Sequence, residues 1–474
     1  MFQPYCEIDN NHVLEYHDVT SLYPFVCSHR ELPIGFPIQY FGQEARNQRP
    51  RLNKNHEDRL FGYIRCRVIP NKKCMLGLLA SREDCKLRFD LEPKIGVWFI
   101  DEIYLAMENG YIVDEIYQIY HWDVHNRSQD YMKGYMSFFL RGKQESDGWP
   151  WGDQEVPIAQ KQARIEELYT KNGNIAKMRI DRVAKNDVQR KICKLYCNCL
   201  WGKFAQDVMS QCSKYIHTYK QLLELHQDPL VNKATVRFRH VASETYHVMY
   251  EQHKDTIPCK AFYNVWMAAA VPAWGRIHLH QRMLAINHNM NDGNNILYCD
   301  TDSVFFRYNK QLESLAGEGL GNWVNEEPNK CITHFYGLAP KAYQYVFSNG
   351  DRKIKTKGVV MTIPNKNKLT TSAIENLIKT AIWEKYSNIP SSIPLLTLDH
   401  FTIFKNSTNG AFNYGEMFSR YSQKQVKAVF TKRALQIPEI LYNDHDMMNE
   451  EDFMNKYSLT SFKRVITLPF GYEL

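Results

Sequence analysis

The stretch LYCDTDSVFF, residues 297–306, sets two acids inside an apolar run that otherwise has the character of a β-strand. Side chains alternate between the two faces of a strand, so Asp300 and Asp302 are expected on the same face. The apolar flanks predict two antiparallel strands with Asp-Thr-Asp at or near their turn. Unpaired carboxylates this close raise each other's pKa, and a divalent cation with oxygen ligands, such as Mg²⁺, removes that penalty. Taken alone, the stretch is more typical of a solvated turn.

A second acid stands at a strand end in YHDVTSLYP, residues 16–24, where Asp18 closes a short strand. Three carboxylates on two strand ends can hold two metal ions about 3.5–4 Å apart. One ion would lower the pKa of an attacking hydroxyl, and the other would take up charge on a leaving phosphate oxygen. The two stretches together therefore predict a two-metal site for phosphoryl transfer.

A third stretch, RKICKLYCNCLWGKF at residues 190–204, reads as a helix. Arg190, Lys194 and Asn198 are spaced i, i+4 and i+8, so they share one helical face. Two cations and an amide on one face suit a triphosphate, and the alternative is a solvated amphipathic face. Gly202 is expected to end this helix or to admit the close approach of a base pair.

The composition describes a chain of 474 residues with a net charge of +7, 44% hydrophobic and 23% charged. This length predicts two to four packed units. No apolar run reaches the roughly 18 residues of a membrane span, so no membrane partner is expected. Charge alone leaves nucleic-acid binding and an ordinary soluble protein equally open. The twelve cysteines include no CxxC pair, which disfavours a zinc site.

The three stretches resemble the motifs of a known family. DVTSLYP, KLYCNCLWG and YCDTDS resemble motifs A, B and C of family B DNA polymerases, usually written DxxSLYP, KxxxNSxYG and YxDTDS, and they occur in the family's order. KAY at residues 341–343 resembles the family's KxY element, and KTKG at residues 355–358 its Lys-Gly segment. Two positions depart from motif B, with Cys199 in place of Ser and Trp201 in place of Tyr. The wider style is similar to the protein-primed subgroup, particularly the polymerases of Polinton/Maverick-type mobile elements.

The resemblance implies a role for each matching residue. Asp18, Asp300 and Asp302 would be catalytic, and two Mg²⁺ ions would be held by Asp18, Asp302 and the backbone carbonyl of Val19. Tyr23 would lie under the incoming sugar and exclude a 2′-OH, which implies selection of deoxynucleotides. The implied nucleotide contacts are Ser21, Leu22, Tyr23, Arg190, Lys194 and Asn198. The implied contacts to DNA and primer are Trp201, Gly202, Thr301, Lys341, Tyr343, Lys353, Lys355 and Lys357. The last three lysines alternate along one predicted strand, for which a solvated edge strand is the alternative.

The implied fold is α+β, a right-hand polymerase with an antiparallel palm sheet, a helical fingers hairpin and a thumb. Two helical segments, residues 158–171 and 183–201, predict the helix pair of the fingers. We expect residues 1–155 to form the first part of the palm with motif A and an insertion, and residues 156–215 the fingers. Residues 216–360 would form the second part of the palm, and residues 361–474 the thumb. Members usually carry a 3′–5′ exonuclease domain before motif A, and we expect this chain to lack it because only 17 residues precede Asp18.

The expected function is DNA-directed DNA synthesis with a DNA template, a primer and dNTPs as partners. The subgroup implies protein-primed replication of a mobile element or virus, although the residues leave open whether a terminal protein or an ordinary primer supplies the hydroxyl. One alternative is a non-catalytic DNA-binding remnant of such an enzyme. Another is an RNA-directed enzyme, which would usually place two adjacent Asp residues where Thr301 separates them here. The compartment is open; a nucleus or a viral factory would suit such replication.

Overall fold

The structure is a computed structural model of the whole chain. It describes residues 1–83, 86–152, 154–206, 212–253, 263–289, 295–309, 316–405, 417–442, 448–462 and 465–473. No helix in these ranges is both long enough and apolar enough to cross a bilayer.

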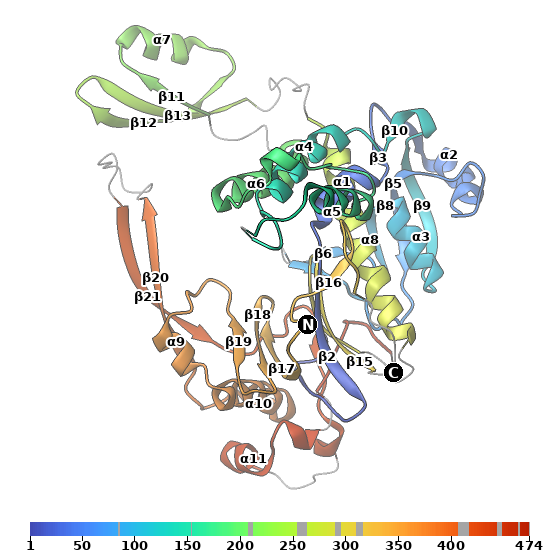
Figure 1. Cartoon of the computed structure of the whole chain (residues 1–474), viewed down its shortest axis with the longest axis vertical. Coiled ribbons are helices and arrows are strands. Elements are labelled where there is room, and N and C mark those ends of the chain that lie inside the picture. Colours follow the sequence, from blue (N-terminus) through green and yellow to red (C-terminus); the bar gives the residue numbers. More distant parts are fainter. Residues whose placement is uncertain are drawn as a thin grey trace.

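An antiparallel sheet occupies the centre of the molecule (Figure 1). Its strands follow the order β14-β15-β2-β17-β18-β19, while β1 pairs with β17 and β16 pairs with β2. Residues 297–306 form the predicted hairpin, and the register places Asp300 opposite Ser303. The strands are β1 (Tyr5–Glu7), β2 (His12–Val19), β14 (Ile296–Asp300), β15 (Ser303–Asn309), β16 (Trp323–Asn325), β17 (Ile332–Ala339), β18 (Ala342–Phe347) and β19 (Arg352–Lys355).

The two faces of this sheet have different surroundings. On one face, Val304, Phe306 and Tyr308 of β15 belong to the large core that includes helix α8 (Val265–Asn289). On the other face, Phe305 joins a compact aromatic cluster with Tyr16, Tyr343 and Tyr345. Asp18 follows Tyr16 by two residues in β2, so it lies on the aromatic face, away from α8.

Residues 32–128 form a second unit beside the sheet. It contains a four-stranded antiparallel sheet of order β4-β9-β5-β8 and two short strand pairs, β3 with β10 and β6 with β7. Helix α3 packs on this sheet and against α8. The elements are β3 (Leu32–Pro33), β4 (Ile38–Phe41), α2 (Gly42–Asn47), β5 (Gly62–Ile69), β6 (Ser81–Glu83), β7 (Lys86–Arg88), β8 (Lys94–Phe99), α3 (Ile100–Glu108), β9 (Ile112–His121) and β10 (Arg127–Ser128).

Four helices lie above the end of the sheet that carries the acids: α1 (Leu22–His29), α4 (Lys133–Glu145), α5 (Ile158–Lys171) and α6 (Asp187–Lys203). The sequence predicted α5 and α6 correctly as helices, but the main packing partner of α6 is α4. Phe139 of α4 stacks on Tyr196 of α6 with ring centroids 4.8 Å apart. A Cβ at Gly142 would lie 2.8 Å from Cys193 Sγ, so the lack of a side chain there permits this close packing. The expected α5–α6 pairing was therefore wrong in its partner.

Two further parts extend from the body (Figure 1). A small unit contains β11 (Cys212–Ile216), α7 (Tyr219–Gln227), β12 (Val231–Ala242) and β13 (Thr245–Gln252), with sheet order β11-β13-β12. The long antiparallel pair β20 (Leu396–Lys405) and β21 (Met417–Val426) points toward this unit.

The remaining C-terminal elements are α9 (Ile363–Lys368), α10 (Thr371–Ser387), β22 (Ala434–Leu435), α11 (Glu450–Lys456) and β23 (Thr467–Leu468). Helix α10 packs against β17 of the central sheet. The N–H of Thr467 donates to the carbonyl of Phe2 at 2.8 Å, and the N–H of Leu91 donates to that of Phe470 at 2.7 Å. The last residues therefore lie with the central body and not with the β20–β21 pair.

Candidate active site

The acids of two segments far apart in the sequence meet where β2 and β15 pair. Asp18 lies opposite Ser303 in that pairing. The N–H of Val19 donates to the carbonyl of Asp302 at 2.8 Å, which fixes the backbone beside both acids. Val19 itself is buried, whereas Asp18 and Asp302 are half-buried.

Burial and repulsion between carboxylates raise the pKa values of Asp18 and Asp302. Burial, and then the charge of Asp302, raise the pKa of Asp18 to about 7. Burial is also the largest cause that raises the pKa of Asp302, followed among the charges by Asp300. Glu326 adds to the shift at Asp18, and the sequence reasoning missed this fourth acid because it lies in a segment without a motif. A cation between the two carboxylates would offset the repulsion.

Asp300 is turned toward a different partner. Its carboxylate lies 2.9 Å from Nζ of Lys341 and accepts a hydrogen bond of 3.2 Å from Thr301 Oγ1. The hydrogen bond with Asp300 raises the pKa of Lys341. Across the described ranges of the chain, no three Asp, Glu, His or Cys side chains converge as a ready-made metal site. Asp18 and Asp302 still fit Mg²⁺, which is commonly held by one or two carboxylates together with substrate phosphates.

Three residues around the acids have a left-handed backbone, which is uncommon for residues other than glycine. Ser21 has φ 54°, Thr301 has φ 54° and Lys341 has φ 62°. Ser21 precedes α1 and Thr301 forms the tip of the β14–β15 turn, so both chain reversals at the site depend on this conformation. Such conformations persist where the surrounding structure enforces them, and they are often found at functional sites.

Lys143 of α4 is a site residue that sequence reasoning missed. Its Nζ donates to Ser21 Oγ at 2.8 Å. Burial, and then the charges of Arg190 and Lys194, lower the pKa of Lys143. In the sequence Lys143 stands among polar residues, in RGKQESD at residues 141–147, and nothing there indicated that α4 would face the motif A turn.

Helix α6 presents Lys194 toward the acids. Lys194 lowers the pKa of both Asp18 and Asp302 in part, so its charge lies within reach of both. Lys194 and Asn198 are exposed, and Asn186 caps the helix by accepting from Gln189 N at 3.0 Å. Arg190 is paired with Asp147, and the charges of Arg190 and Lys194 both lower the pKa of Lys143. The role of Arg190 toward a phosphate stays a prediction.

The residues at the end of α6 face the motif A turn. The rings of Tyr23 and Trp201 lie 5.0 Å apart, and both side chains are half-buried. The helix continues to Lys203, so Gly202 does not end it, and no atom lies within 4 Å of a Cβ built there. The space at Gly202 is thus open to the approach of another molecule. Leu22 is buried in the core, and its predicted place beside a nucleotide stays a prediction.

The predicted primer and DNA contacts on β18 and β19 are only partly available. Tyr343 is 3% exposed within the aromatic cluster, which corrects its predicted direct contact with a primer. Lys353 is paired with the buried carboxylate of Glu327, so its charge is already compensated. Lys355 is exposed and lies 5.5 Å from the ring centroids of both Tyr16 and Tyr343. Lys357 is exposed but lies beyond the end of β19, so the three lysines do not form one strand face.

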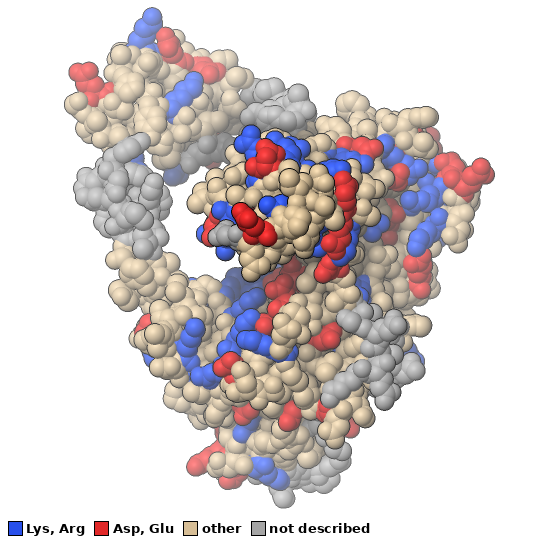
Figure 2. All heavy atoms as spheres, viewed as in Figure 1, with Lys and Arg blue, Asp and Glu red and all other residues tan. Residues whose placement is uncertain are grey.

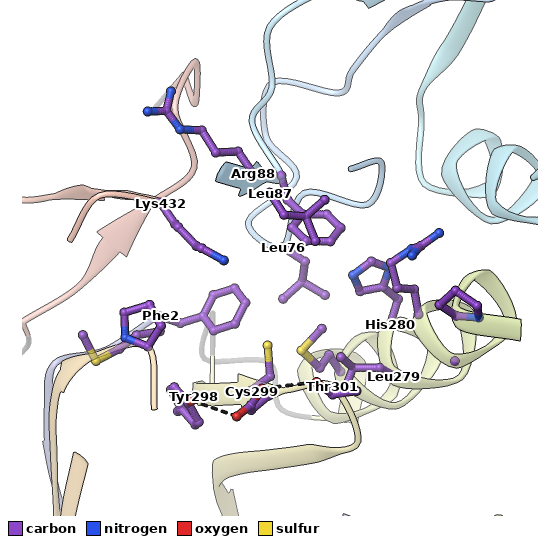
Figure 3. A pocket seen from close by; sticks show the side chains of 18 of the residues that line it. Phe2, Leu76, Leu87, Arg88, Leu279, His280, Tyr298, Cys299, Thr301 and Lys432 are labelled. Atoms are coloured by element: carbon purple, nitrogen blue, oxygen red, sulfur yellow. Dashed lines mark hydrogen bonds between the residues drawn. The ribbon is translucent and has the colours of Figure 1, made fainter. Parts of the chain in front are cut away.

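A cavity of ≈ 370 Å³ lies behind the β14–β15 turn (Figure 3). Cys299 and Thr301 border it on one side, Leu279 of α8 on another, and Lys432 reaches into it from the C-terminal segment. Tyr23 and the Asp300–Lys341 pair also line it. The turn that carries the acids is therefore not packed solidly from behind.

Comparison with known proteins gives the following similarities. Residues 1–149 match the family described as DNA polymerase type B, organellar and viral. This region contains Asp18 and Lys143, while Lys194 and Asp302 lie beyond it. The chain is also 26% identical over 408 residues to a probable DNA polymerase of Podospora anserina. That match covers 82% of this chain and 30% of the relative, so the chain spans less than a third of the relative's length.

Among solved structures, Phi29 DNA polymerase with primer-template DNA and incoming nucleotides is similar with a TM-score of 0.49 and 15% identity. The match covers 90% of this chain and 61% of that one. Phi29 DNA polymerase with single-stranded DNA has a TM-score of 0.45 and 16% identity, over 79% of this chain and 55% of that one.

Proposed function

We propose that this chain is a DNA-directed DNA polymerase that adds dNTPs to a primer 3′-OH. The observation that carries the proposal is the meeting of Asp18 and Asp302 at the β2–β15 pairing, with the charge of Lys194 acting on both acids and Lys143 bound to Ser21 beside them. The match of residues 1–149 to type B polymerases supports it. In this proposal the central sheet is the palm, α4 and α6 belong to the fingers, and the β20–β21 pair belongs to the thumb.

The chain's own residues would act mainly by positioning and by charge. Lys143 of α4 and Lys194 of α6 would bind the triphosphate, and a charge-assisted hydrogen bond to phosphate is stronger than a neutral one. Tyr23 would lie under the sugar, where its ring leaves no room for a 2′-OH. When bound at Asp18 and Asp302, two Mg²⁺ ions would lower the pKa of the 3′-hydroxyl and neutralise charge on the leaving pyrophosphate.

Asp300 has a different role in this proposal. Because its carboxylate is paired with Lys341, it would hold that lysine at the edge of the site, where the ammonium can meet a primer phosphate. With Asp300 paired to Lys341, the carboxylates of Asp18 and Asp302 remain to bind the metal ions. Protein priming of a mobile element or virus is the finer part of the proposal. Its support is the resemblance of the motifs to that subgroup.

Primer extension on a defined DNA template with Mg²⁺ tests the proposal. We expect extension by the unmodified chain, and no detectable extension by Asp302→Asn, while both bind the primer–template equally well. Asp181→Asn is the matched control because Asp181 is an exposed acid away from the site. Binding without extension by the unmodified chain would favour the non-catalytic remnant. Incorporation of label onto a protein hydroxyl in the absence of an oligonucleotide primer would support protein priming.

A further inference from the structure

The cavity behind the β14–β15 turn has the size and the lining of a small-molecule site. Its volume of ≈ 370 Å³ lies in the lower part of the range of about 300–1,000 Å³ that such sites occupy. The exposed side chains of Leu87 and Lys432 border it, so it is open to solvent on that side. Its apolar wall comes from three distant segments and consists of Phe2, Leu76, Phe89, Leu279 and Met283. A compact apolar molecule would therefore be shielded from water over most of its surface.

One end of the cavity carries two cations without a counter-charge. Lys432 reaches into the cavity from the C-terminal segment (Figure 3), and Arg433 beside it is 8% exposed. The guanidinium of Arg433 donates to Thr467 Oγ1 at 3.1 Å and to the carbonyls of Thr467 and Met75 at 2.9 and 3.0 Å. All of these acceptors are neutral, and within the described ranges no carboxylate pairs with either cation. Burial of a cation is costly without a nearby negative charge, so an anion bound at this end would offset that cost.

Two further cations at the cavity are already compensated. Arg276 of α8 binds Glu102 of α3 through hydrogen bonds of 2.7 and 3.0 Å, and Lys341 is paired with Asp300. Among the described residues that line the cavity, Asp300 is the only carboxylate. An anionic ligand would therefore meet little repulsion in the cavity and attraction at the end that carries the two unpaired cations.

The opposite side of the cavity holds a buried histidine whose ring nitrogens are unused. His280 of α8 is 5% exposed, and within the described part of the chain neither of its nitrogens has a hydrogen-bond partner. Its ring meets the ring of Phe89 edge-on, with centroids 5.4 Å apart. Burial, and then the charge of Arg276, lower the pKa of His280 to about 3, so the ring is neutral and has one donor and one acceptor. Figure 3 shows His280 and Lys432 on opposite sides of the cavity, so a ligand that spans it can meet both.

We propose that the cavity binds a small amphipathic acid. Its anionic group lies at Lys432 and Arg433, its apolar body packs against Phe2 and Leu279, and a hydrogen-bonding group faces His280. Such a ligand supplies a counter-charge at one end and a hydrogen-bond partner at the other. A hydrocarbon would supply neither, and a small inorganic anion would leave the apolar wall in contact with water.

The bound acid restrains the turn that carries Asp300 and Asp302. Cys299 and Thr301 lie at that turn and also line the cavity. A ligand packed against them favours one position of the turn without occupying the place of the triphosphate. We therefore expect it to lower kcat for primer extension more than it changes the KM for dNTPs. This consequence rests on the proposed polymerase function, whereas the binding itself does not.

Two fluorescent dyes of nearly the same shape test the binding on the whole chain. 8-Anilinonaphthalene-1-sulfonate has an anionic group, an aromatic body and an N–H, and N-phenyl-1-naphthylamine lacks only the sulfonate. Both fluoresce more strongly in apolar surroundings, so a titration gives the affinity.

The variants separate the two ends of the cavity. Lys432→Met should weaken binding of the sulfonate dye about tenfold, the loss of one charge-assisted hydrogen bond, and leave that of the neutral dye unchanged. His280→Phe should weaken both dyes about fivefold, since both present an N–H to the imidazole. Lys427→Met is the matched control for the charge, because Lys427 is an exposed lysine of the same segment outside the cavity.

The place of binding needs a readout of its own. Lys and Arg side chains also gather over β18 and β19, below α6, so an anionic dye is attracted to that surface as well (Figure 2). Alkylation of Cys299 by iodoacetamide, mapped by mass spectrometry, reports on the cavity itself. The sulfonate dye should slow the alkylation of Cys299 and not that of Cys331, an exposed cysteine outside the cavity.

Equal affinity of the sulfonate dye for Lys432→Met and for the unmodified chain would overturn the proposal, and so would an equal loss in Lys427→Met. Unchanged alkylation of Cys299 with dye bound would overturn it because the dye would lie elsewhere. No alkylation of Cys299 without dye would overturn it because the cavity would be closed. None of these measurements needs primer extension, so an inactive chain would contradict the proposed function alone. An active chain that binds the dye and extends primers at an unchanged rate would overturn the effect on the turn.

Discussion

Replacing Asp18 with Asn should stabilise the metal-free protein at alkaline pH while it abolishes synthesis. The pKa of Asp18 is raised from 3.8 to about 7 by burial and by Asp302. A carboxyl whose pKa is raised on folding binds more protons in the folded than in the unfolded state between those two values. The free energy of unfolding therefore falls as the pH rises from 3.8 to about 7 and is constant above.

The shift sets the size of the effect. About three pKa units at 1.36 kcal/mol each amount to about 4 kcal/mol at pH 8, an upper bound because water and ions screen a half-buried group. Asn carries no charge at any pH, so Asp18→Asn removes this cost. Its advantage over the unmodified chain should grow by up to about 2.7 kcal/mol between pH 5 and pH 8, since two of those units lie between pH 5 and 7.

Urea unfolding at pH 5 and pH 8, without divalent cations, measures this difference. Asp181→Asn should show no such pH-dependent gain. Adding Mg²⁺ at pH 8 should stabilise the unmodified chain more than Asp18→Asn, because a ligand that binds only the folded state raises its stability. The reasoning is refuted if the gain of Asp18→Asn is the same at both pH values, since the penalty would then not arise from ionisation of Asp18.

Three further predictions concern the walls of the site. Lys143→Met should lower kcat/KM for dNTP insertion by about tenfold or more, the loss of one charge-assisted hydrogen bond, whereas Lys133→Met on the exposed first turn of α4 should not change it. Tyr23→Val should reduce discrimination between dNTPs and rNTPs, and an unchanged ratio of their kcat/KM values would count against a gate. Lys353→Met should lower the free energy of unfolding by about 1 kcal/mol, because the buried carboxylate of Glu327 loses a partner, with little change in duplex affinity. A large loss of duplex affinity would instead restore Lys353 as a phosphate contact.

The hairpin of the central sheet and the ends of its strands could be predicted from sequence because they depend on local patterns. Apolar alternation and an acid at each strand end indicated the β14–β15 hairpin and the end of β2, and both are present. Which side chains face the site depends on packing between distant elements. Tyr343 has the sequence context of a primer contact, yet the pairing of β18 with its neighbours buries its ring.

Lys143 is the opposite case, a residue that lies at the site although its sequence context did not predict it. Its place next to Ser21 is set by α4 packing along α6, and that contact depends on the absence of a side chain at Gly142 and on the stacking of Phe139. Likewise, the partner of Asp300 is Lys341, which follows β17 and reaches Asp300 only in the folded sheet. The residue types in the sequence indicated metal and phosphate binding. Contacts between distant elements decided which charged side chains remain available to bind a ligand.

The left-handed backbone at Ser21, Thr301 and Lys341 means that main-chain geometry, and not the carboxylates, gives the site its shape. An acid-to-amide variant should keep that shape after it has lost its chemistry. Such a variant would bind template, primer and nucleotide without incorporating the nucleotide. The resulting stalled complex would be suitable for structure determination. At Ser21 and Lys341, valine or isoleucine would disfavour the left-handed backbone and would therefore disturb the shape of the site.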